Sequence, residues 1–574
     1  MDEYGVGRTF SEIADLLEIK GDNPYRIRAY RRAARALKRF PESIRDLWER
    51  GELQTIPGIG KDLAGKIAEI LTTGRCSYLE ELHGEIPPEL LEFLALPGVG
   101  PKTIRAVYSQ LEITSLKELE RAARRGDLRQ LPGLGAKTEL KILQGIHSYK
   151  ARRGELPLGE VMPLAKELYH QLQALPGVEE VSFTGDLRRR RDKVRGINIL
   201  VSSRVGEEVI AAFRDLFQLA RVEAEGGNRI VVTTRFRIKV DLWVVTPEQY
   251  AFALLWATGS SGHYQGLRER AAYLGLELTE CGLFQGGQRL LSVTEDDIYR
   301  LLKLPYIPPE LREDRGEIQA AIRDNLPKLV TLEDIKGDFH SHTSWSDGYY
   351  SLEEMANAAR SLGYHYLAIT DHSQSLSIAR GLTPERLLQQ VQEIKKLNGK
   401  LTDLQLLTGT EVDILADGTL DYADDILSQL DLVIASVHSH FHQDEGTMTA
   451  RIVKAIGNPH VDILGHPSGR LLGRREPYAV DMEAVLQAAA QTRTVVEINA
   501  SPERLDLTDH WVKRAREMGV KLAVNSDAHV GKRLRDMNYG LSVARRGWLE
   551  ADDLINTWSW EEVQDYFEKG VAHG

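Results

Sequence analysis

The sequence predicts a multidomain protein with a helical N-terminal region and a C-terminal parallel sheet or barrel. Three observations predict this order. The chain has 574 residues, which is enough for three or four domains of ordinary size. A short Pro-Gly turn recurs three times near the N-terminus. In the last 238 residues, apolar strand-like runs alternate with helical segments, as in parallel α/β structures.

Composition places the chain among ordinary globular proteins. Charged residues make up 27% and hydrophobic residues 42% of it, which excludes disordered, collagen-like and coiled-coil proteins. We expect no membrane span, because no run of about 18 uncharged apolar residues occurs, and no signal peptide, because the N-terminus is acidic. Only two cysteines occur, Cys76 and Cys281, which excludes a disulfide scaffold or a thiolate zinc finger and favours a cytoplasmic location.

Charge is divided unevenly along the chain. Residues 1–336 include 50 basic and 49 acidic residues, whereas residues 337–574 include 23 basic and 35 acidic residues and 12 of the 16 histidines. The second part is therefore acidic and rich in imidazole, a composition that suits metal cations. The first part is neutral overall but holds arginine clusters at residues 26–39, 121–129 and 188–191, which favour either phosphate binding or solvated helix faces.

The Pro-Gly turn follows the pattern Leu-Pro-Gly-x-Gly, with isoleucine first in one copy, at residues 56–60, 96–100 and 131–135. Paired glycines permit a tight turn with positive φ, and the helix that follows presents free backbone N–H groups that suit a phosphate. Three such turns resemble helix-hairpin-helix motifs, which bind DNA backbones without sequence preference. The resemblance implies DNA contacts at Gly58, Gly60, Lys61, Gly98, Gly100, Lys102, Gly133, Gly135 and Lys137.

Metal-ligand residue types recur directly after the apolar runs of the last 238 residues. Side chains at the C-terminal ends of parallel barrel strands converge on one mouth, so residues scattered in sequence meet in one pocket. The residue types are imidazole and carboxylate without thiolate, which suits Zn²⁺, Mn²⁺ or Fe²⁺. The candidate ligands are His340, His342, Asp347, His372, Glu411, His438, His466, Asp527 and His529.

Two family resemblances organise these motifs. The basic helix at 23–37, the three turns and the segments 184–189, 240–242, 258–260 and 267–271 resemble a bacterial or archaeal family X DNA polymerase, and the ligand pattern is similar to the PHP (polymerase and histidinol phosphatase) domain. They imply helical helix-hairpin-helix domains, an α+β nucleotidyltransferase-like palm and thumb, and a distorted (β/α)7 barrel. The expected domains are 1–85 (lyase-like, first hairpin), 86–155 (second and third hairpins), 156–245 (degenerate palm), 246–320 (thumb-like), 321–336 (linker) and 337–574 (PHP).

The palm departs from the family at its metal-binding carboxylates. The family places three aspartates on neighbouring strands, two of them as Asp-x-Asp, to hold two Mg²⁺ ions. Here that pair reads Gly196-x-Asn198 and only Asp241 remains, while Asp186 stands where the family has a serine that seats the triphosphate. Because hard cations need carboxylate oxygens, we expect polymerase activity to be lost or weak, with Mg²⁺ serving any that is left.

Lys66 matches the position of a family lysine that forms a Schiff base with an abasic sugar. Asp62 stands where the family has a neighbouring lysine. An amine nucleophile is activated by nearby cations or burial, so Lys66 is either a lyase nucleophile or an ordinary helix lysine.

The PHP resemblance implies up to three metal ions. His340, His342, Glu411 and Asp527 would hold one, Glu411 would bridge to a second held by His438 and His466, and Asp347, His372 and His529 would hold a third. Such ions lower the pKa of bound water from about 15.7 toward 7 and stabilise a leaving oxygen. Glu411 and Asp527 are the candidate catalytic carboxylates, and Arg470 and Arg475 are either phosphate-binding or surface arginines.

These observations predict a metal-dependent 3′→5′ exonuclease or phosphoesterase that acts, as a monomer, on gapped, nicked or 3′-ended DNA in repair. Two alternatives remain. One is an active gap-filling DNA polymerase with an editing exonuclease, and the other is a non-catalytic DNA-end scaffold with structural metals. A small-molecule phosphatase is disfavoured, because it would not need the hairpins.

Overall fold

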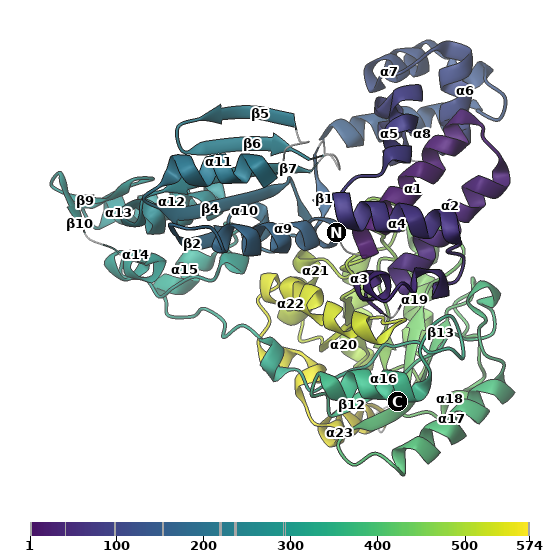
Figure 1. Ribbon diagram of the computed structural model, residues 1–574. Coiled ribbons are helices and arrows are strands. Elements are labelled where there is room, and N and C mark those ends of the chain that lie inside the picture. Colours follow the sequence, from purple (N-terminus) through teal and green to yellow (C-terminus); the bar gives the residue numbers. More distant parts are fainter. Residues whose placement is uncertain are drawn as a thin grey trace. The chain divides into compact units, whose positions relative to one another are not determined.

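The computed structural model describes the chain except for residues 1–2, 41, 97–98, 152–153, 217–220, 235–237, 291, 293 and 572–574. It divides into two compact units, residues 1–153 and 154–574 (Figure 1). The second unit contains three parts: a five-stranded sheet, a small helical subdomain and a barrel. Each part has its own hydrophobic core.

The first unit is helical throughout its described residues. Its helices are α1 (Glu3–Lys20), α2 (Pro24–Arg39), α3 (Ile44–Glu49), α4 (Lys61–Thr73), α5 (Ser77–Glu85), α6 (Pro101–Leu111), α7 (Leu116–Arg125) and α8 (Ala136–Ala151). Asn23 and Ser43 cap α2 and α3, and Ser115 forms a reciprocal capping box with Glu118 on α7. One continuous apolar cluster runs from Val6 to Ile146 and holds the unit together.

The middle of the chain forms the predicted α+β palm. Its sheet has the order β2 (Val178–Phe183), β4 (Ile197–Ser203), β7 (Lys239–Val245), β6 (Arg229–Thr233) and β5 (Arg221–Gly226). Only the β4–β7 pair is parallel. The helices α9 (Leu158–Gln173), α10 (Gly185–Arg188) and α11 (Gly206–Leu216) accompany it, and β1 (Leu156–Pro157) pairs with β3 (Lys193–Val194).

The thumb-like subdomain follows the palm. It comprises α12 (Pro247–Thr258), α13 (Ser261–Tyr273), a small sheet of β8 (Glu277–Thr279), β9 (Gly282–Gln285) and β10 (Gln288–Leu290), α14 (Glu295–Leu301) and α15 (Glu317–Ile322). A buried carboxylate organises it. Glu295 accepts hydrogen bonds from Arg312 at 2.7 Å and from Arg188 of the palm at 2.6 Å. Such a buried charge is tolerated only because it is paired.

The C-terminal part is a parallel barrel of seven strands in chain order. They are β11 (Gly337–Asp338), β12 (Tyr366–Ile369), β13 (Gln405–Asp413), β14 (Leu432–Ser436), β15 (Ile463–Leu464), β16 (Val495–Asn499) and β17 (Leu522–Asn525). A parallel bridge between Ser341 and Ala528 brings the last strand back to the first, so the barrel is nearly closed. The predicted fold class is confirmed.

Helices surround the barrel, as the alternating sequence pattern predicts. They are α16 (Leu352–Ser361), α17 (Pro384–Asn398), α18 (Asp424–Leu427), α19 (Glu445–Ile456), α20 (Met482–Thr492), α21 (Asp509–Glu517), α22 (Met537–Arg546) and α23 (Trp560–Val571). Strands such as β12 and β14 are buried at every position, because helices cover one face of a barrel strand and the barrel interior covers the other.

Buried ion pairs join the barrel to the palm and thumb. Arg546 of α22 donates a hydrogen bond to the backbone oxygen of Arg189 at 3.0 Å and pairs with Glu313 at 2.9 Å. Arg470 of the barrel pairs with Asp192 of the palm at 2.9 Å.

Within the described part of the chain, no helix is long and apolar enough to cross a membrane.

Candidate metal centre and palm site

The nine predicted ligands gather at the C-terminal mouth of the barrel. His340, His372, His438, His466 and Asp527 each follow the end of a strand within a few residues, and Glu411 lies near the end of β13. Parallel strands of similar register end at the same edge, which explains why residues almost 190 positions apart in the sequence are neighbours here. The structure therefore brings all nine together, as the strand-end pattern predicts.

Glu411 lies at the centre of the cluster. One carboxylate oxygen is 2.8 Å from Nε2 of His466 and 3.3 Å from Nε2 of His438, and the other is 2.9 Å from Nδ1 of His372. Its second oxygen is also 3.4 Å from Nε2 of His340. A carboxylate with imidazoles around both oxygens is suited to bridging two cations.

Asp527 and Asp347 extend the cluster. Oδ1 of Asp527 is 3.2 Å from Nε2 of His342, and Asp347 lies 3.3 Å from Nε2 of His529 and 3.6 Å from Nε2 of His372. Three sets have ligand atoms that all lie within 4.8 Å of one another: His342 with Asp347, His372 and His529; His340 with His342 and Asp527; and His372 with Glu411 and His438.

These residues fit metal ions rather than a hydrogen-bonded polar core. Nε2 of His340 and both ring nitrogens of His342 are buried and have no hydrogen-bond partner among the described residues. The 3.2 Å approach of His342 to Asp527 lacks hydrogen-bond geometry. Because a buried polar atom without a partner is costly, a cation that accepts these lone pairs accounts for their arrangement.

Buried carboxylates behind the cluster orient its histidines. Oε1 of Glu497 on β16 is 2.7 Å from Nδ1 of His340, and Asp413 on β13 is 2.5 Å from Nδ1 of His438. A carboxylate on one ring nitrogen fixes the tautomer and directs the other nitrogen toward the cation. The strand-end pattern in the sequence does not point to Glu497 or Asp413. Asp413 follows Glu411 by two residues and so shares its strand face, which is a signal that could have found it.

The backbone is strained at two of the candidate ligands. His466 has a φ of 26° and Asp527 a φ of 52°, in the left-handed region that non-glycine residues rarely adopt. Such strain of about 1–3 kcal/mol per residue persists only where the surrounding structure imposes it, and it concentrates at functional sites.

The electrostatics of the pocket keep its carboxylates ionised. Burial by itself would raise the pKa of Glu411, but the positive charges of His438 and His340 outweigh it and hold that pKa well below its usual range. The same balance, with His340 as the main charge, lowers the pKa of Asp527. Burial, assisted by the neighbouring His529 and His372, lowers the pKa of His342 to about 4, which keeps this imidazole neutral and able to bind a cation.

The two arginines that the sequence offers as either phosphate-binding or surface residues occupy different positions. Arg470 is buried and donates to the backbone oxygens of Arg504 and Leu505 and to Asp192 of the palm, contacts that favour a joining role over a phosphate-binding one. Arg475 is partly exposed, donates to the oxygen of Gly469 at 2.9 Å, and remains a candidate for phosphate binding.

In the palm, Arg229 forms an ion pair with Asp241, the one aspartate that remains of the three expected from the family pattern. The pairing of β4 with β7 sets Asn198 directly beside Asp241. Arg229 of β6 donates two hydrogen bonds to Asp241, at 2.9 Å and 2.6 Å. A bidentate guanidinium satisfies both carboxylate oxygens, so a cation would have to displace it.

The other palm positions that depart from the family pattern, Gly196 and Asp186, are also constrained by their neighbours. Gly196 has a φ of 143°, and a Cβ at this position would lie 2.5 Å from the backbone oxygen of Lys239. Asp186 accepts a hydrogen bond from Arg189 at 2.7 Å. The arginine cluster at 188–191 thus forms buried ion pairs within the palm and thumb, with Arg188 on Glu295 and Arg189 on Glu313.

The hairpin turns adopt the predicted local geometry where the structure describes them. Gly58 and Gly133 have φ values of 86° and 81°, and Gly60 and Gly100 are the N-caps of α4 and α6. Gly135 accepts the first helical bonds of α8. Lys61, Lys102 and Lys137 lie in the first turns of these helices, and Gly98 lies outside the described residues. DNA contact at these positions stays a prediction.

Lys66 lies on α4 and is largely buried. Its Nζ is 2.6 Å from Oδ1 of Asp62 and 5.4 Å from the centroid of the Tyr78 ring. Tyr78 stacks on Tyr30 and accepts a hydrogen bond from Arg26. A Schiff base at Lys66 would require the ion pair with Asp62 to open, and the lyase role stays a prediction.

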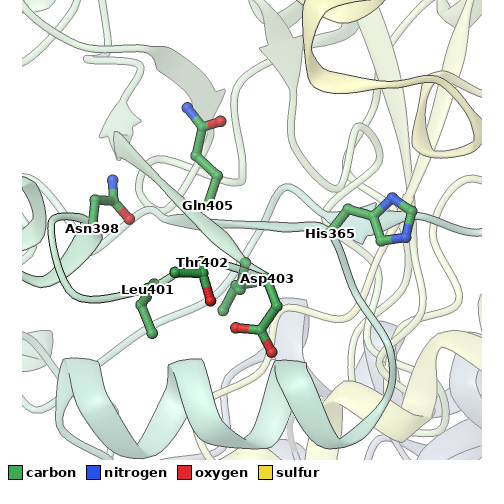
Figure 2. Close-up of a pocket in the computed structure, with 7 residues that line it drawn as sticks. His365, Asn398, Leu401, Thr402, Asp403 and Gln405 are labelled. Atoms are coloured by element: carbon green, nitrogen blue, oxygen red, sulfur yellow. The ribbon is translucent and has the colours of Figure 1, made fainter.

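A second hollow on the barrel is not part of this centre. It has a volume of about 460 Å³ and is lined by residues 398 and 401–405 and by His365, which lies just before β12 (Figure 2). Gln405 begins β13, so the hollow lies at the N-terminal end of the strands, opposite the ligand cluster. Catalytic residues of such barrels lie at the other end.

Comparisons with known proteins agree with this architecture. Four family models match: a helix-hairpin-helix domain at residues 6–76, a SAM-like helix-hairpin-helix tandem at 90–148, a DNA polymerase beta thumb at 253–313 and a PHP domain at 338–501. The first three indicate DNA binding, and the fourth, with the His/Asp/Glu clusters, implies divalent metals. Fold and site thus define a polymerase-type DNA-processing protein with a PHP domain.

Whole-chain similarity identifies the family. The chain is 38% identical to the DNA polymerase/3′-5′ exonuclease PolX of Bacillus subtilis (strain 168) over 573 residues, which cover 99% of this chain and 100% of that protein. It therefore belongs to the PolX family of family X DNA polymerases, and the recognition made from the motifs is confirmed. A probable phosphatase of Thermoanaerobacter sp. (strain X514) is 34% identical over 38% of this chain and 89% of its own length.

Proposed function

We propose that this protein is a metal-dependent 3′→5′ exonuclease and phosphoesterase of DNA ends whose PHP centre performs the chemistry and whose palm incorporates nucleotides weakly or not at all. One contrast supports the proposal most strongly. The PHP pocket gathers nine candidate imidazole and carboxylate ligands, and several of its buried ring nitrogens have no hydrogen-bond partner among the described residues. In the palm, by contrast, Arg229 forms a bidentate ion pair with Asp241, the remaining candidate metal-binding carboxylate.

In the proposed reaction, an oxygen of water bonds to the phosphorus of the terminal phosphodiester and the P–O3′ bond breaks. The products are a nucleoside 5′-monophosphate and a strand that ends in a 3′-hydroxyl. Cations bound in the pocket would supply an activated water at neutral pH and neutralise the phosphate. Glu411 and Asp527 would hold them, since both carboxylates lie among imidazoles that can share a cation with them.

The proposed ligand assignment has up to three ions, of Zn²⁺, Mn²⁺ or Fe²⁺, and all nine residues contribute. Two of the three sets with mutually close ligand atoms contain a carboxylate together with His342, which supports this histidine as a shared ligand. The proposed substrate is the 3′ end at a gap or nick, because helix-hairpin-helix turns bind backbones without reading sequence. We also propose that the protein is a monomer. Light scattering with and without DNA tests this proposal.

The deciding experiment uses labelled gapped DNA with Mn²⁺, with and without dNTPs. We expect shortening of the labelled strand under both conditions, and its loss in His340→Ala. The matched control is His365→Ala, which removes an imidazole from the hollow at the opposite end of the barrel (Figure 2). Net lengthening with dNTPs would instead indicate a working polymerase, and a gel shift without any change in strand length would indicate a scaffold.

A further inference from the structure

Arg504 places a guanidinium beside the ligand cluster, and one of its nitrogens lacks a hydrogen-bond partner among the described residues. Its Nε is 3.6 Å from Oδ2 of Asp527, too far for a hydrogen bond, and its Nη1 is buried with no hydrogen-bond partner among the described residues. The residue lies in the loop after β16, a strand that the ligand pattern in the sequence did not select. A buried N–H group without an acceptor is costly, so this position favours an anion that is bound during function.

A second guanidinium lies nearby. The backbone N–H of Leu472 donates to the oxygen of Glu503 at 2.7 Å, and Leu471 pairs with Arg475, so the segment that carries Arg475 lies against the loop that carries Arg504. Arg475 stacks over the ring of Phe441 at 4.0 Å, which fixes its plane. Two neighbouring guanidinium groups repel one another, and a phosphate offsets that repulsion while accepting their hydrogen bonds.

The backbone of Arg504 is held from the palm through one side chain. Arg470 donates to the backbone oxygen of Arg504 at 3.0 Å and to that of Leu505, and its remaining nitrogen donates to Asp192 at 2.9 Å. Asp192 is itself fixed, because its backbone oxygen accepts from the N–H of Leu158 at 2.9 Å. A continuous set of hydrogen bonds thus connects the palm to the loop that carries Arg504.

A close packing contact acts on the same loop. Gly159 is the second residue of α9 of the palm, and a Cβ at this glycine would lie 2.2 Å from Cβ of Pro502. Only a glycine allows the palm helix to approach the loop this closely. The palm therefore contacts residues 502–505 both by packing and by hydrogen bonds. Because close-packed protein interiors deform little, these contacts fix the position of the loop.

We propose that Arg504 binds a phosphate oxygen of the substrate in the PHP pocket, and that the palm positions it there through Asp192 and Arg470. The proposal rests on the proposed phosphoesterase function and adds a role for the palm that does not need its lost carboxylates. Arg504 contacts substrate in this account, whereas Asp192 and Arg470 are positioning residues.

The first test measures inorganic phosphate binding by isothermal titration calorimetry, with full-length protein loaded with Mn²⁺. We expect Arg504→Gln to raise the Kd for phosphate by at least ~10-fold, and Arg504→Lys to raise it less, because an ammonium keeps the charge but loses the bidentate geometry. Metal content by elemental analysis should be unchanged in both. An unchanged Kd in Arg504→Gln would overturn the assignment.

The second test separates positioning from simple stability. Asp192→Asn should raise the phosphate Kd by about three- to tenfold with unchanged metal content, and should add little to Arg504→Gln in the double variant, because both act on one interaction. Asp403→Asn is the matched control, since it removes an exposed arginine pair, with Arg360, in the same barrel. Additive effects of Asp192→Asn and Arg504→Gln would refute the positioning role.

Failure of this proposal is distinguishable from failure of the proposed function. If the wild-type protein degrades gapped DNA but phosphate binding does not depend on Arg504, the phosphoesterase function stands and the role of Arg504 is wrong. If phosphate binding depends on Arg504 and no DNA strand is shortened, the binding role stands and the DNA-end function is wrong.

Discussion

Arg229 donates two hydrogen bonds to Asp241, across the β6–β7 ladder and beside the strand that carries Asn198. The resemblance to family X polymerases implies a site for two Mg²⁺ ions at this corner of the palm. Here the Arg229 guanidinium supplies, beside Asp241, the positive charge that a metal ion would otherwise supply. Asp241 is thus engaged in a bidentate ion pair with Arg229, which a cation would have to displace.

Restoring the lost carboxylates is not expected to restore polymerisation. The triple variant Asp186→Ser, Gly196→Asp, Asn198→Asp should still fail to extend a primer on gapped DNA, because a Cβ at residue 196 would lie 2.5 Å from the oxygen of Lys239. The strained backbone should also lower the free energy of unfolding by about 1–3 kcal/mol. Asn198→Asp alone, the control, should keep wild-type stability. Primer extension by the triple variant at the rate of strand degradation would contradict this account.

Glu497 is expected to act on metal affinity through His340. Glu497→Gln removes the charge that orients Nδ1 of this imidazole, so metal affinity should fall about 10–100-fold, measured by equilibrium dialysis. Glu483→Gln, which removes an exposed carboxylate paired with Arg514, is the matched control. If both variants retain wild-type affinity, Glu497 has only a packing role.

Because of the buried Glu295 ion pairs, we expect the stability of the palm–thumb junction to decrease at acid pH. Burial opposes its ionisation, but Arg312 and Arg188 prevail and lower its pKa from 4.5 to about 2. A depressed pKa stabilises the folded state above pH 4.5, and that contribution, up to about 3 kcal/mol, is lost as the pH falls toward 2. Denaturant unfolding midpoints should therefore fall between pH 4.5 and 2 in the wild type.

Glu295→Gln tests the assignment of that acid sensitivity. It should be destabilised by about 3–5 kcal/mol at pH 7, because it leaves Arg312 buried and unpaired, and should show a smaller change with pH. Glu248→Gln, which removes an exposed pair with Arg204, should follow the wild type. An identical acid profile for Glu295→Gln would place the sensitivity elsewhere.

Lys66 is expected to be the residue trapped by borohydride if the chain cleaves abasic sites. The adduct should disappear in Lys66→Ala and persist in Lys61→Ala, which alters the same helix. Asp62→Asn should increase its yield, because the ion pair at 2.6 Å no longer holds the ammonium. Adduct formation that survives Lys66→Ala would assign the chemistry to another amine.

Sequence patterns predicted the parts that follow from local rules. The barrel and its ligands were accessible because parallel strands end together, so His340 and His466 could be placed in one pocket from strand ends alone. Arg229 was not accessible, since its contact with Asp241 depends on strand register. Glu497 lies on β16 and Arg504 in the loop after it. Both were missed because β16 ends at Asn499 and not at a histidine or carboxylate that would mark a metal site. The sequence left Arg470 open between a phosphate-binding and a surface arginine, because its contact with Asp192 depends on domain packing that no local pattern encodes.

The most direct test of the central claim is anomalous diffraction from crystals of the full-length protein soaked in Mn²⁺. The account predicts strong anomalous peaks among the nine barrel residues, within coordination distance of Glu411 and Asp527, and none beside Asp241 and Asn198. A manganese peak at Asp241 with Arg229 displaced, or a barrel pocket without any peak, would contradict it.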